Sequence, residues 1–172
     1  AAETAGQLGV KFENIVGFSK TVKNLELATN LGDAAGESLA RIANITGLPQ
    51  TQFENLGSTI VALGNNSAAT ESDIVDMTLR LGAAGRLVGM SVSETTAFAA
   101  SLASVGINAE AGGTAFSKLF IELSRQVAMG GDDLAAFANA AGMSVAKFSD
   151  LFRNDAAAAV QALIGGLGKL DG

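Results

Sequence analysis

The chain has 172 residues, of which 48% are hydrophobic and only 16% charged, and its formal net charge is −6. It contains no cysteine and no histidine, which excludes histidine-based catalytic triads, cysteine nucleophiles and the usual zinc and haem sites. The negative charge and the scattered basic residues argue against direct contact with nucleic acid, because nucleic-acid-binding surfaces need clustered lysine and arginine.

The length predicts one helical domain over residues 1–172. The chain starts at Ala1 rather than at a methionine and stops at Gly172, from which we expect a piece of a longer protein. The longest uncharged run, residues 55–70, contains a polar Gly-Asn-Asn-Ser stretch and does not reach the roughly 20 apolar residues of a membrane span.

Apolar residues recur at three- and four-residue steps along the whole chain, a spacing typical of helices. Phe116, Leu119, Phe120 and Leu123, for example, follow the i, i+3, i+4, i+7 pattern. The sequence therefore predicts an all-α fold, a multi-helix bundle of short helices joined by glycine-containing turns. In chain order, we expect helices over residues 11–29, 33–45, 51–64, 71–87, 92–105, 110–128, 132–141, 145–153 and 156–164.

Three of these helix starts carry the pattern of a capping box, a hydroxyl residue followed three positions later by an acid. The hydroxyl accepts a free backbone N–H of the first turn, and the acid accepts the N–H of the capping residue itself. The pairs are Thr51 with Glu54, Thr70 with Asp73, and Ser91 with Glu94. Further single caps are expected at Asp33, Asp132 and Asp155.

A glycine followed by an apolar residue precedes several of these starts. Glycine just past a helix end can adopt the left-handed conformation that terminates the helix, and the apolar residue can pack back onto it. The copies begin at Gly9, Gly47, Gly89 and Gly142. They indicate repeated helix–turn–helix units, although their spacing is too irregular to predict a solenoid.

The stretch VGINAEAGGTAFSKLF, residues 105–120, raises the question of a phosphate-binding loop. A phosphate loop of the G-x-x-x-x-G-K-[ST] type needs a lysine and a hydroxyl after its second glycine, whereas Gly113 is followed by Thr114 and an alanine. We interpret the stretch instead as a corner, in which Gly106 closes one helix while Gly113 and Thr114 lie near the start of the next.

Paired carboxylates are the only catalytic chemistry that the composition leaves open. The candidate pairs are Glu94 with Glu110 and Glu110 with Glu122. Glycoside hydrolysis would need two such groups across a sugar cleft, but a helix start alone explains acids at positions 94 and 110. We therefore predict no catalytic, metal-binding or cofactor-binding residue and no enzyme, with a muralytic activity resting on Glu94 or Glu110 as the least favoured alternative.

Residues 63–123 resemble the core region of phage tail tape measure proteins. Members of that family have an Asn-Ser turn, an acid-capped amphipathic helix, a glycine-apolar-Ser turn, an acid-capped alanine-rich helix, a Gly-Ile turn and an Ala-Gly-Thr helix start. The matching positions are Asn66-Ser67, Asp73, Gly89-Met90-Ser91, Glu94-Thr95, Ala103, Gly106-Ile107 and Ala111-Gly112-Gly113-Thr114-Ala115. The additional glycine departs from the family pattern and is expected to soften that helix start. Residues 1–62 and 124–172 are similar in style only.

The resemblance implies a structural component of a phage or prophage tail. Tape measure proteins occupy the lumen of the tail tube in a few self-associated copies, set tail length, assist assembly and leave when DNA is ejected. The implied partners are tail tube and tail tip proteins and tail assembly chaperones, and the implied locations are the virion tail and, during assembly, the host cytoplasm. The alternative function is a membrane-active helical module that opens the host envelope during ejection.

Overall fold

The computed structural model describes residues 2–131 and 133–169, so Asp132, expected above to cap a helix, lies outside the described residues. Within these ranges the chain forms α-helices and short 3₁₀ turns and contains no strand, and the all-α prediction is confirmed. The elements are α1 (Ala2–Gln7), η1 (Phe12–Asn14), α2 (Ile15–Ala28), η2 (Gly32–Ala34), α3 (Ala35–Thr46), η3 (Gln50–Gln52), α4 (Phe53–Asn65), α5 (Glu71–Leu87), α6 (Val92–Ser104), α7 (Ala109–Met129), α8 (Asp133–Ala140), α9 (Val145–Asn154) and α10 (Ala156–Leu167).

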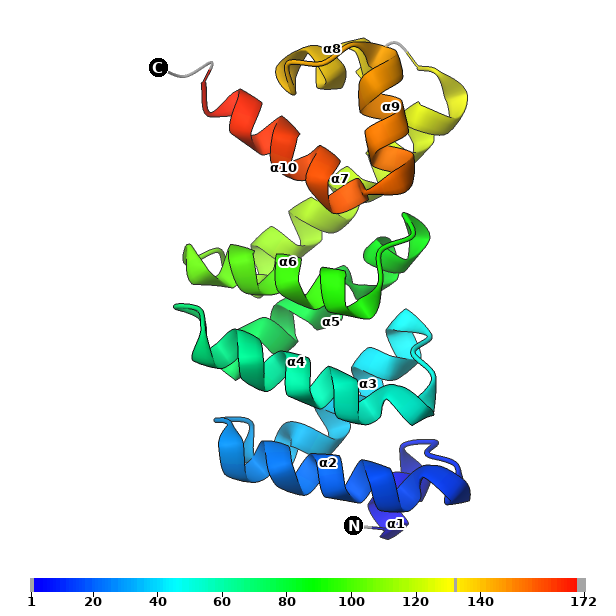
Figure 1. Ribbon diagram of the computed structural model, residues 1–172, viewed down its shortest axis with the longest axis vertical. Helices are drawn as coiled ribbons and strands as arrows, with labels where there is room; N and C mark the ends of the chain where they lie inside the picture. Colours follow the sequence, from blue (N-terminus) through cyan, green and yellow to red (C-terminus); the bar gives the residue numbers. More distant parts are fainter. Residues whose placement is uncertain (1, 132, 170–172) are drawn as a thin grey trace.

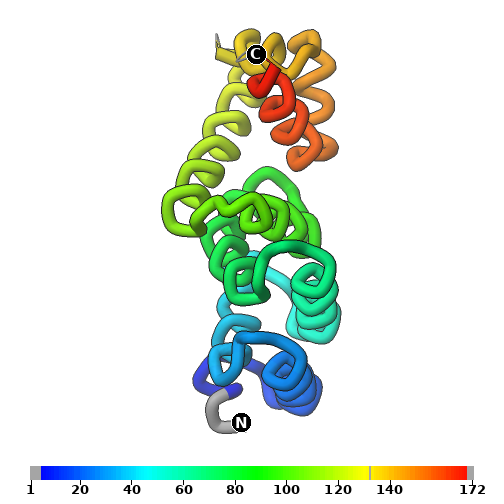
Figure 2. The backbone as a smooth tube through the Cα atoms, turned by 90° about the vertical axis from the view of Figure 1, so that its left-hand side faces the viewer, coloured from blue at the N-terminus to red at the C-terminus, as the bar shows by residue number. Residues whose placement is uncertain are grey.

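The helices pack into a bundle that is drawn out along one axis as a stack of layers (Figure 1). Helices α2, α4 and α6 lie one above another, and α3, α5 and α7 form a second column beside them; neighbouring helices of each column are in contact. Figure 2 shows the columns from the side, with α7 rising from the α5–α6 layer to the C-terminal helices α8–α10. The weak sequence repeats thus correspond to stacked helix pairs, an arrangement also found in α-solenoids.

Several of the turns between helices share one backbone geometry. At Gly89, φ is +83° and the N–H of Met90 donates to the carbonyl of Gly85 at 2.9 Å. This six-to-one bond is that of a Schellman motif, which requires a left-handed residue at the position of the glycine. The same pairing of a left-handed glycine with a six-to-one bond occurs at Gly9, Gly47, Gly106 and Gly142.

The shared turn geometry determines where the next helix begins, because the N-cap residue comes two positions after the glycine. After Gly89 that residue is Ser91, but after Gly47 it is Pro49, which has no side-chain cap. The chain then makes η3 before α4 starts at Phe53. Thr51 therefore lies within η3, and the expected capping box between Thr51 and Glu54 is wrong.

The same geometry accounts for the start of α7, which begins at Ala109, one residue before the predicted start at residue 110. Two residues after Gly106 stands Asn108, whose Oδ1 accepts the N–H groups of Glu110 at 2.8 Å and Ala111 at 3.3 Å. The helix therefore begins several residues before Thr114, whose hydroxyl instead donates to the carbonyl of Glu110 at 2.6 Å within α7. Thr114 is thus the sixth residue of α7 and does not cap it, and the two glycines do not interrupt the helix.

Other boundaries differ at the N-terminal end. The helix expected over residues 11–29 is divided into η1 and α2, and the helix α1 was not predicted. Asp33 was expected to cap a helix but lies inside η2 and makes no capping hydrogen bond, so this prediction is also wrong. Asp155, in contrast, accepts the N–H of Ala158 at 2.9 Å as the N-cap of α10.

Two main apolar cores fill the stack. The N-terminal core is made by buried side chains of α1–α4 with Val75 of α5, and the C-terminal core by buried side chains of α5–α10, among them Met77 and Leu81. Phe18 and Phe53 meet edge-to-face in the first core, with ring centroids 4.9 Å apart. Helix α5 therefore contributes to both cores and joins the two halves of the stack.

Candidate functional site

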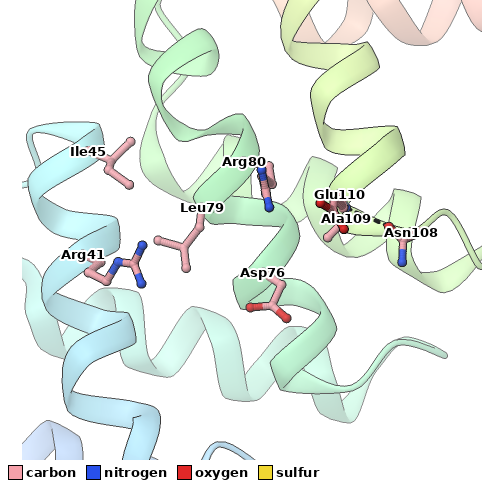
Figure 3. Close-up of a pocket in the computed structure, with 8 residues that line it drawn as sticks. All are labelled: Arg41, Ile45, Asp76, Leu79, Arg80, Asn108, Ala109 and Glu110. Carbon is pink, nitrogen blue, oxygen red and sulfur yellow. Dashed lines mark hydrogen bonds between the residues drawn. The ribbon is translucent and has the colours of Figure 1, made fainter.

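A surface pocket of about 640 Å³ crosses the column of α3, α5 and α7 (Figure 3). Helix α5 provides its centre, while α3 borders one side and the α6–α7 turn with the first turn of α7 borders the other. The pocket exists because three helices from separate parts of the chain lie side by side at this level. Its lining residues are Arg41, Ile45, Asp76, Leu79, Arg80, Asn108, Ala109 and Glu110.

The charges of this pocket are mixed in sign and exposed. Arg41 contacts Glu37 one helical turn away, with N and O atoms 3.3 Å apart. Within the described residues, neither Arg80 nor Asp76 takes part in an ion pair of 4 Å or less. Asn108 is already used as the cap of α7. The pocket thus offers separate positive and negative groups for recognising a polar segment, with no nucleophile beside a base.

The carboxylates considered for catalysis are not brought together. Glu94 lines a different pocket, between α6 and the start of α10, whereas Glu110 lines the pocket of Figure 3. Glu110 and Glu122 lie twelve residues apart on α7, about 18 Å along the axis at 1.5 Å per residue. Retaining and inverting glycosidases hold their carboxyl groups within about 10 Å of each other, so the pair on α7 does not fit either geometry.

The other two predicted capping boxes, Thr70 with Asp73 and Ser91 with Glu94, are formed. The N–H of Asp73 donates to the hydroxyl of Thr70, and the N–H of Thr70 donates to the carboxylate of Asp73, each at 3.2 Å. At Ser91 the corresponding distances are 3.2 and 2.7 Å. Hydrogen bonds from the side chain and the backbone N–H of Ser91 lower the pKa of Glu94. The perturbed carboxylate at position 94 is thus accounted for by helix capping.

A second acid with a shifted pKa lies on α7. Glu122 accepts hydrogen bonds from Arg125 at 2.6 Å and from the side-chain amide of Gln126 at 2.7 Å, and these bonds lower its pKa to about 2. The amide of Gln126 also donates to Asp133 at the start of α8, at 3.2 Å. This cluster links the end of α7 to α8.

We expect the Glu122 cluster to make stability depend on pH below about 4.5. Because its pKa is lower in the folded chain than the ordinary value of 4.5, the carboxylate stabilises the folded state above that value, and this contribution is lost as pH falls toward 2. Glu122→Gln should therefore melt below the unmodified chain at pH 7, and the difference should shrink between pH 4.5 and pH 2. Melting followed by circular dichroism, with Glu54→Gln as the control, tests this. A difference that is independent of pH would contradict it.

Side chains that sequence reasoning missed connect successive layers of the stack. The side chain of Gln50 accepts the N–H of Lys11 at 2.8 Å and donates to the carbonyl of Gly9 at 2.8 Å, so one turn holds the turn below it. At the opposite ends of these helices, the side chain of Asn30, just after α2, accepts the N–H of Ser72 in the first turn of α5 at 3.0 Å. These pairs are about 40 residues apart in sequence, and no local pattern indicates them.

The two helix caps that were not predicted, in contrast, follow a local sequence pattern. Asn108 and Ser144 both cap helices, and each stands two residues after a turn glycine, as Ser91 does. The guanidinium group of Arg86 packs against the turn glycine Gly47: a Cβ atom added at Gly47 would lie 2.9 Å from its carbon.

The predicted turn and cap residues lie in separate turns of the stack and do not converge on one site.

Among the described residues, no group of three or more acidic side chains is placed to hold a metal ion, and no helix is long and apolar enough to cross a membrane. In comparisons with known proteins, the model of a family described as phage-related minor tail protein matches residues 1–172. No curated protein and no solved structure matches the chain.

Proposed function

This chain belongs to the family of phage-related minor tail proteins, and we propose that it is a stretch of a tape measure protein that acts in the tail by its length and its contacts. The observation that carries the proposal is the layered stack. Neighbouring helices of each column pack against one another along a single axis. In such an arrangement, adding or removing helix pairs changes length without a change in the remaining layers. That property suits a protein whose length determines the length of an assembly.

The partners that we propose are tail tube and tail tip proteins, tail assembly chaperones and a few further copies of the same chain. The proposed location is the lumen of the tail tube, after assembly in the host cytoplasm. Two features support association through surfaces: the low charged fraction of 16% and the several large apolar side chains that are exposed. Protein surfaces with few charges and exposed apolar groups favour association.

The test is tail length in virions whose gene lacks codons 1–172 of this stretch in frame. If the segment is extended as helix in the tail, its deletion should shorten tails by about 260 Å, at 1.5 Å per residue. If it stays folded as a stack in the tail, the loss should be only roughly 40 Å, because stacked helices lie 8–10 Å apart. Electron microscopy of negatively stained virions measures either change.

A replacement variant provides the control for this experiment. An unrelated helical segment of the same length, put in place of the deleted one, should restore normal length if the chain acts as a ruler. Deleted virions with normal tails would contradict the ruler function. A replacement that fails to restore tails of any kind would show instead that specific contacts of this segment are needed for assembly.

One observation favours the alternative, a membrane-active module. Exposed apolar side chains lie on η1 and α2: Phe12 of η1 is 91% accessible, and Val16 and Leu27 of α2 are 80% and 77% accessible. Lys20 and Lys23 of α2 are exposed as well. Apolar and basic side chains on one helix surface are typical of helices that bind at a membrane interface.

The alternative predicts leakage of dye from vesicles with anionic lipid at micromolar protein. It also predicts that Phe12→Ser combined with Val16→Ser abolishes the leakage, because these two side chains are the most exposed large apolar groups of η1 and α2. The matched control is Val105→Ser, at an exposed apolar position in the α6–α7 turn. An absence of leakage, or leakage that the Phe12→Ser, Val16→Ser double variant leaves unchanged, would contradict the membrane function.

A further inference from the structure

The pocket of Figure 3 contains two opposite charges that would ordinarily pair with each other. Asp76 and Arg80 are four residues apart on α5, with the acid nearer the helix N-terminus. This is the spacing and the order in which an exposed acid and base form an ion pair on a helix. Among the described residues, however, neither makes an ion pair of 4 Å or less. Figure 3 shows the carboxylate and the guanidinium group apart along α5.

The packing of α7 on α5 explains why these groups stay apart. The Cβ and Cγ atoms of Arg80 lie beneath α7, where a Cβ atom added at Gly113 would be 2.6 and 3.2 Å from them. The carbonyl of Arg80 also accepts a hydrogen bond from the hydroxyl of Ser117, another residue of α7, at 2.8 Å. The base of the arginine side chain is therefore held at the α5–α7 contact, which restricts how far its guanidinium group can turn toward Asp76.

The helices on either side of α5 restrict the shape of an occupant. Both pack closely on α5 at a glycine, α3 at Gly82 and α7 at Gly113. Closely packed helices lie about 8 Å apart, so α3 and α7 are separated by roughly 16 Å across α5. A helix with its side chains is about 10–12 Å in diameter, which leaves a space of roughly 5 Å between them. An extended chain fits this width, because neighbouring strands lie about 4.8 Å apart, but another helix does not.

The hollow continues along α5 toward the N-terminus of that helix. A second pocket, of about 300 Å³, shares Asp76 with the first and reaches Asp73 and the α6–α7 turn at Gly106 and Ile107. The two pockets together thus follow the axis of α5 for more than one helical turn. A segment of polypeptide has room to continue on that side beyond the two unpaired charges.

We propose that this hollow binds an extended segment of a partner protein in which a basic and an acidic residue stand two positions apart. Asp76 and Arg80 are separated by about 6 Å along α5, at 1.5 Å per residue. Alternate residues of an extended chain are about 6.6 Å apart and point to the same side. The basic residue of the segment meets Asp76, and the acidic residue meets Arg80. A free amino acid cannot make both contacts, because its ammonium and carboxylate groups are attached to the same carbon atom.

The remaining lining of the pocket suits such a segment. Leu79 and Ile45 form an apolar wall on the side of α3. The aliphatic stem of a lysine can lie along this wall while its ammonium group meets the carboxylate. Binding of this kind goes beyond the proposed tail function and does not rest on it, because it depends only on the charges and the width of the hollow.

The test uses the whole chain and fluorescein-labelled nine-residue peptides of serine and glycine with three central residues that differ. A peptide centred on Lys-Ala-Glu is expected to bind in fluorescence anisotropy at low ionic strength, where exposed charges are least screened. A peptide of the same composition centred on Ala-Lys-Glu should bind about threefold more weakly or worse, because adjacent residues point to opposite sides and one charge contact is lost. Equal binding of these isomers, or no binding of the first at about 1 mM, would overturn the proposal.

A charge reversal in the chain locates the binding. Arg80→Glu keeps the Cβ and Cγ atoms that pack near Gly113, and it should shift preference from Lys-Ala-Glu toward Lys-Ala-Lys by about fivefold or more. The matched control is Lys20→Glu, an equal change of charge at an exposed position of α2, and circular dichroism checks that both variants are folded. If both variants shift the preference equally, the attraction is general and the hollow is not the site. If the unmodified chain dimerises in sedimentation and Arg80→Glu is monomeric, a second copy is the occupant and the assignment to a partner is overturned.

Discussion

Replacing Phe120 with alanine is expected to lower the free energy of unfolding by about 3–5 kcal/mol, the cost typical of removing a buried phenylalanine. The side chain of Phe120 is 1% accessible, and its ring meets that of Phe98 edge-to-face at a centroid distance of 5.6 Å. Helix α7 carries it into the C-terminal core, where α5 and α6 meet α8–α10. The cavity would therefore lie where the C-terminal helices are attached to the stack, and neighbouring side chains on several helices would lose contacts at once.

Urea denaturation followed by circular dichroism measures this change, and Phe12→Ala is the matched control. Phe12 is 91% accessible, so its truncation should change stability by less than about 0.5 kcal/mol. We propose further that residues 1–172 unfold as one domain, because α5 contributes Val75 to the N-terminal core and Met77 to the C-terminal core. The Phe120→Ala variant is then expected to show a single unfolding transition, shifted as a whole to lower urea concentration. Two separate transitions, with only one displaced in the Phe120 variant, would show that the halves of the stack unfold independently.

The parts of the fold that were predictable from sequence are those that local chemistry determines. The helix over residues 71–87 has the predicted bounds, because Thr70 and Asp73 are neighbours in sequence and make the cap by themselves. The turn at Gly89 was predictable for the same reason, because it depends on the adjacent residues Gly89 and Met90. The resemblance found in residues 63–123 is confirmed at the level of the family, whose model matches the chain from residue 1 to residue 172.

The errors arise where one local signal is overruled by another. Thr51 and Glu54 have the spacing of a capping box, but the turn at Gly47 had already placed the N-cap at Pro49. The helix predicted from residue 110 is α7, but its capping residue, Asn108, was not predicted, although it stands two residues after Gly106. In both cases a Schellman turn places the N-cap of the next helix two residues after its glycine, and reading the glycine first would have identified that residue.

The candidate site and the stack were not predictable because they depend on contacts between distant residues. The pocket of Figure 3 combines Arg41 with Glu110, from helices separated by α4, α5 and α6. The amide of Gln50 reaches a turn of the preceding layer, at Gly9. Periodicity indicates which side of each helix is buried, but it does not indicate which helix covers that side.

Replacing Gly113 with valine is expected to destabilise the stack by about 1–3 kcal/mol, the range typical of overpacked sites. A Cβ atom at this position would lie 2.6 Å from Cβ of Arg80 and 3.3 Å from Sδ of Met77. The first of these atoms is next to the backbone of α5 and cannot turn aside, so α5 and α7 would have to separate. Separation would also break the hydrogen bond from the hydroxyl of Ser117 to the carbonyl of Arg80, now 2.8 Å long.

Gly17→Val distinguishes this effect from helix propensity. A Cβ atom at Gly17, in α2, meets nothing within 4 Å, and valine is the better helix former by a few tenths of a kcal/mol, so that variant should be neutral or slightly more stable. Thermal melting of both variants gives the comparison. If Gly113→Val and Gly17→Val have the same melting temperature, α5 and α7 do not cross as closely as described. Gly113 would then belong to a softened helix start, as the sequence predicted. If only Gly113→Val is destabilised, the additional glycine that departs from the family pattern has a structural reason, because it lets two helices of one column meet at their backbones.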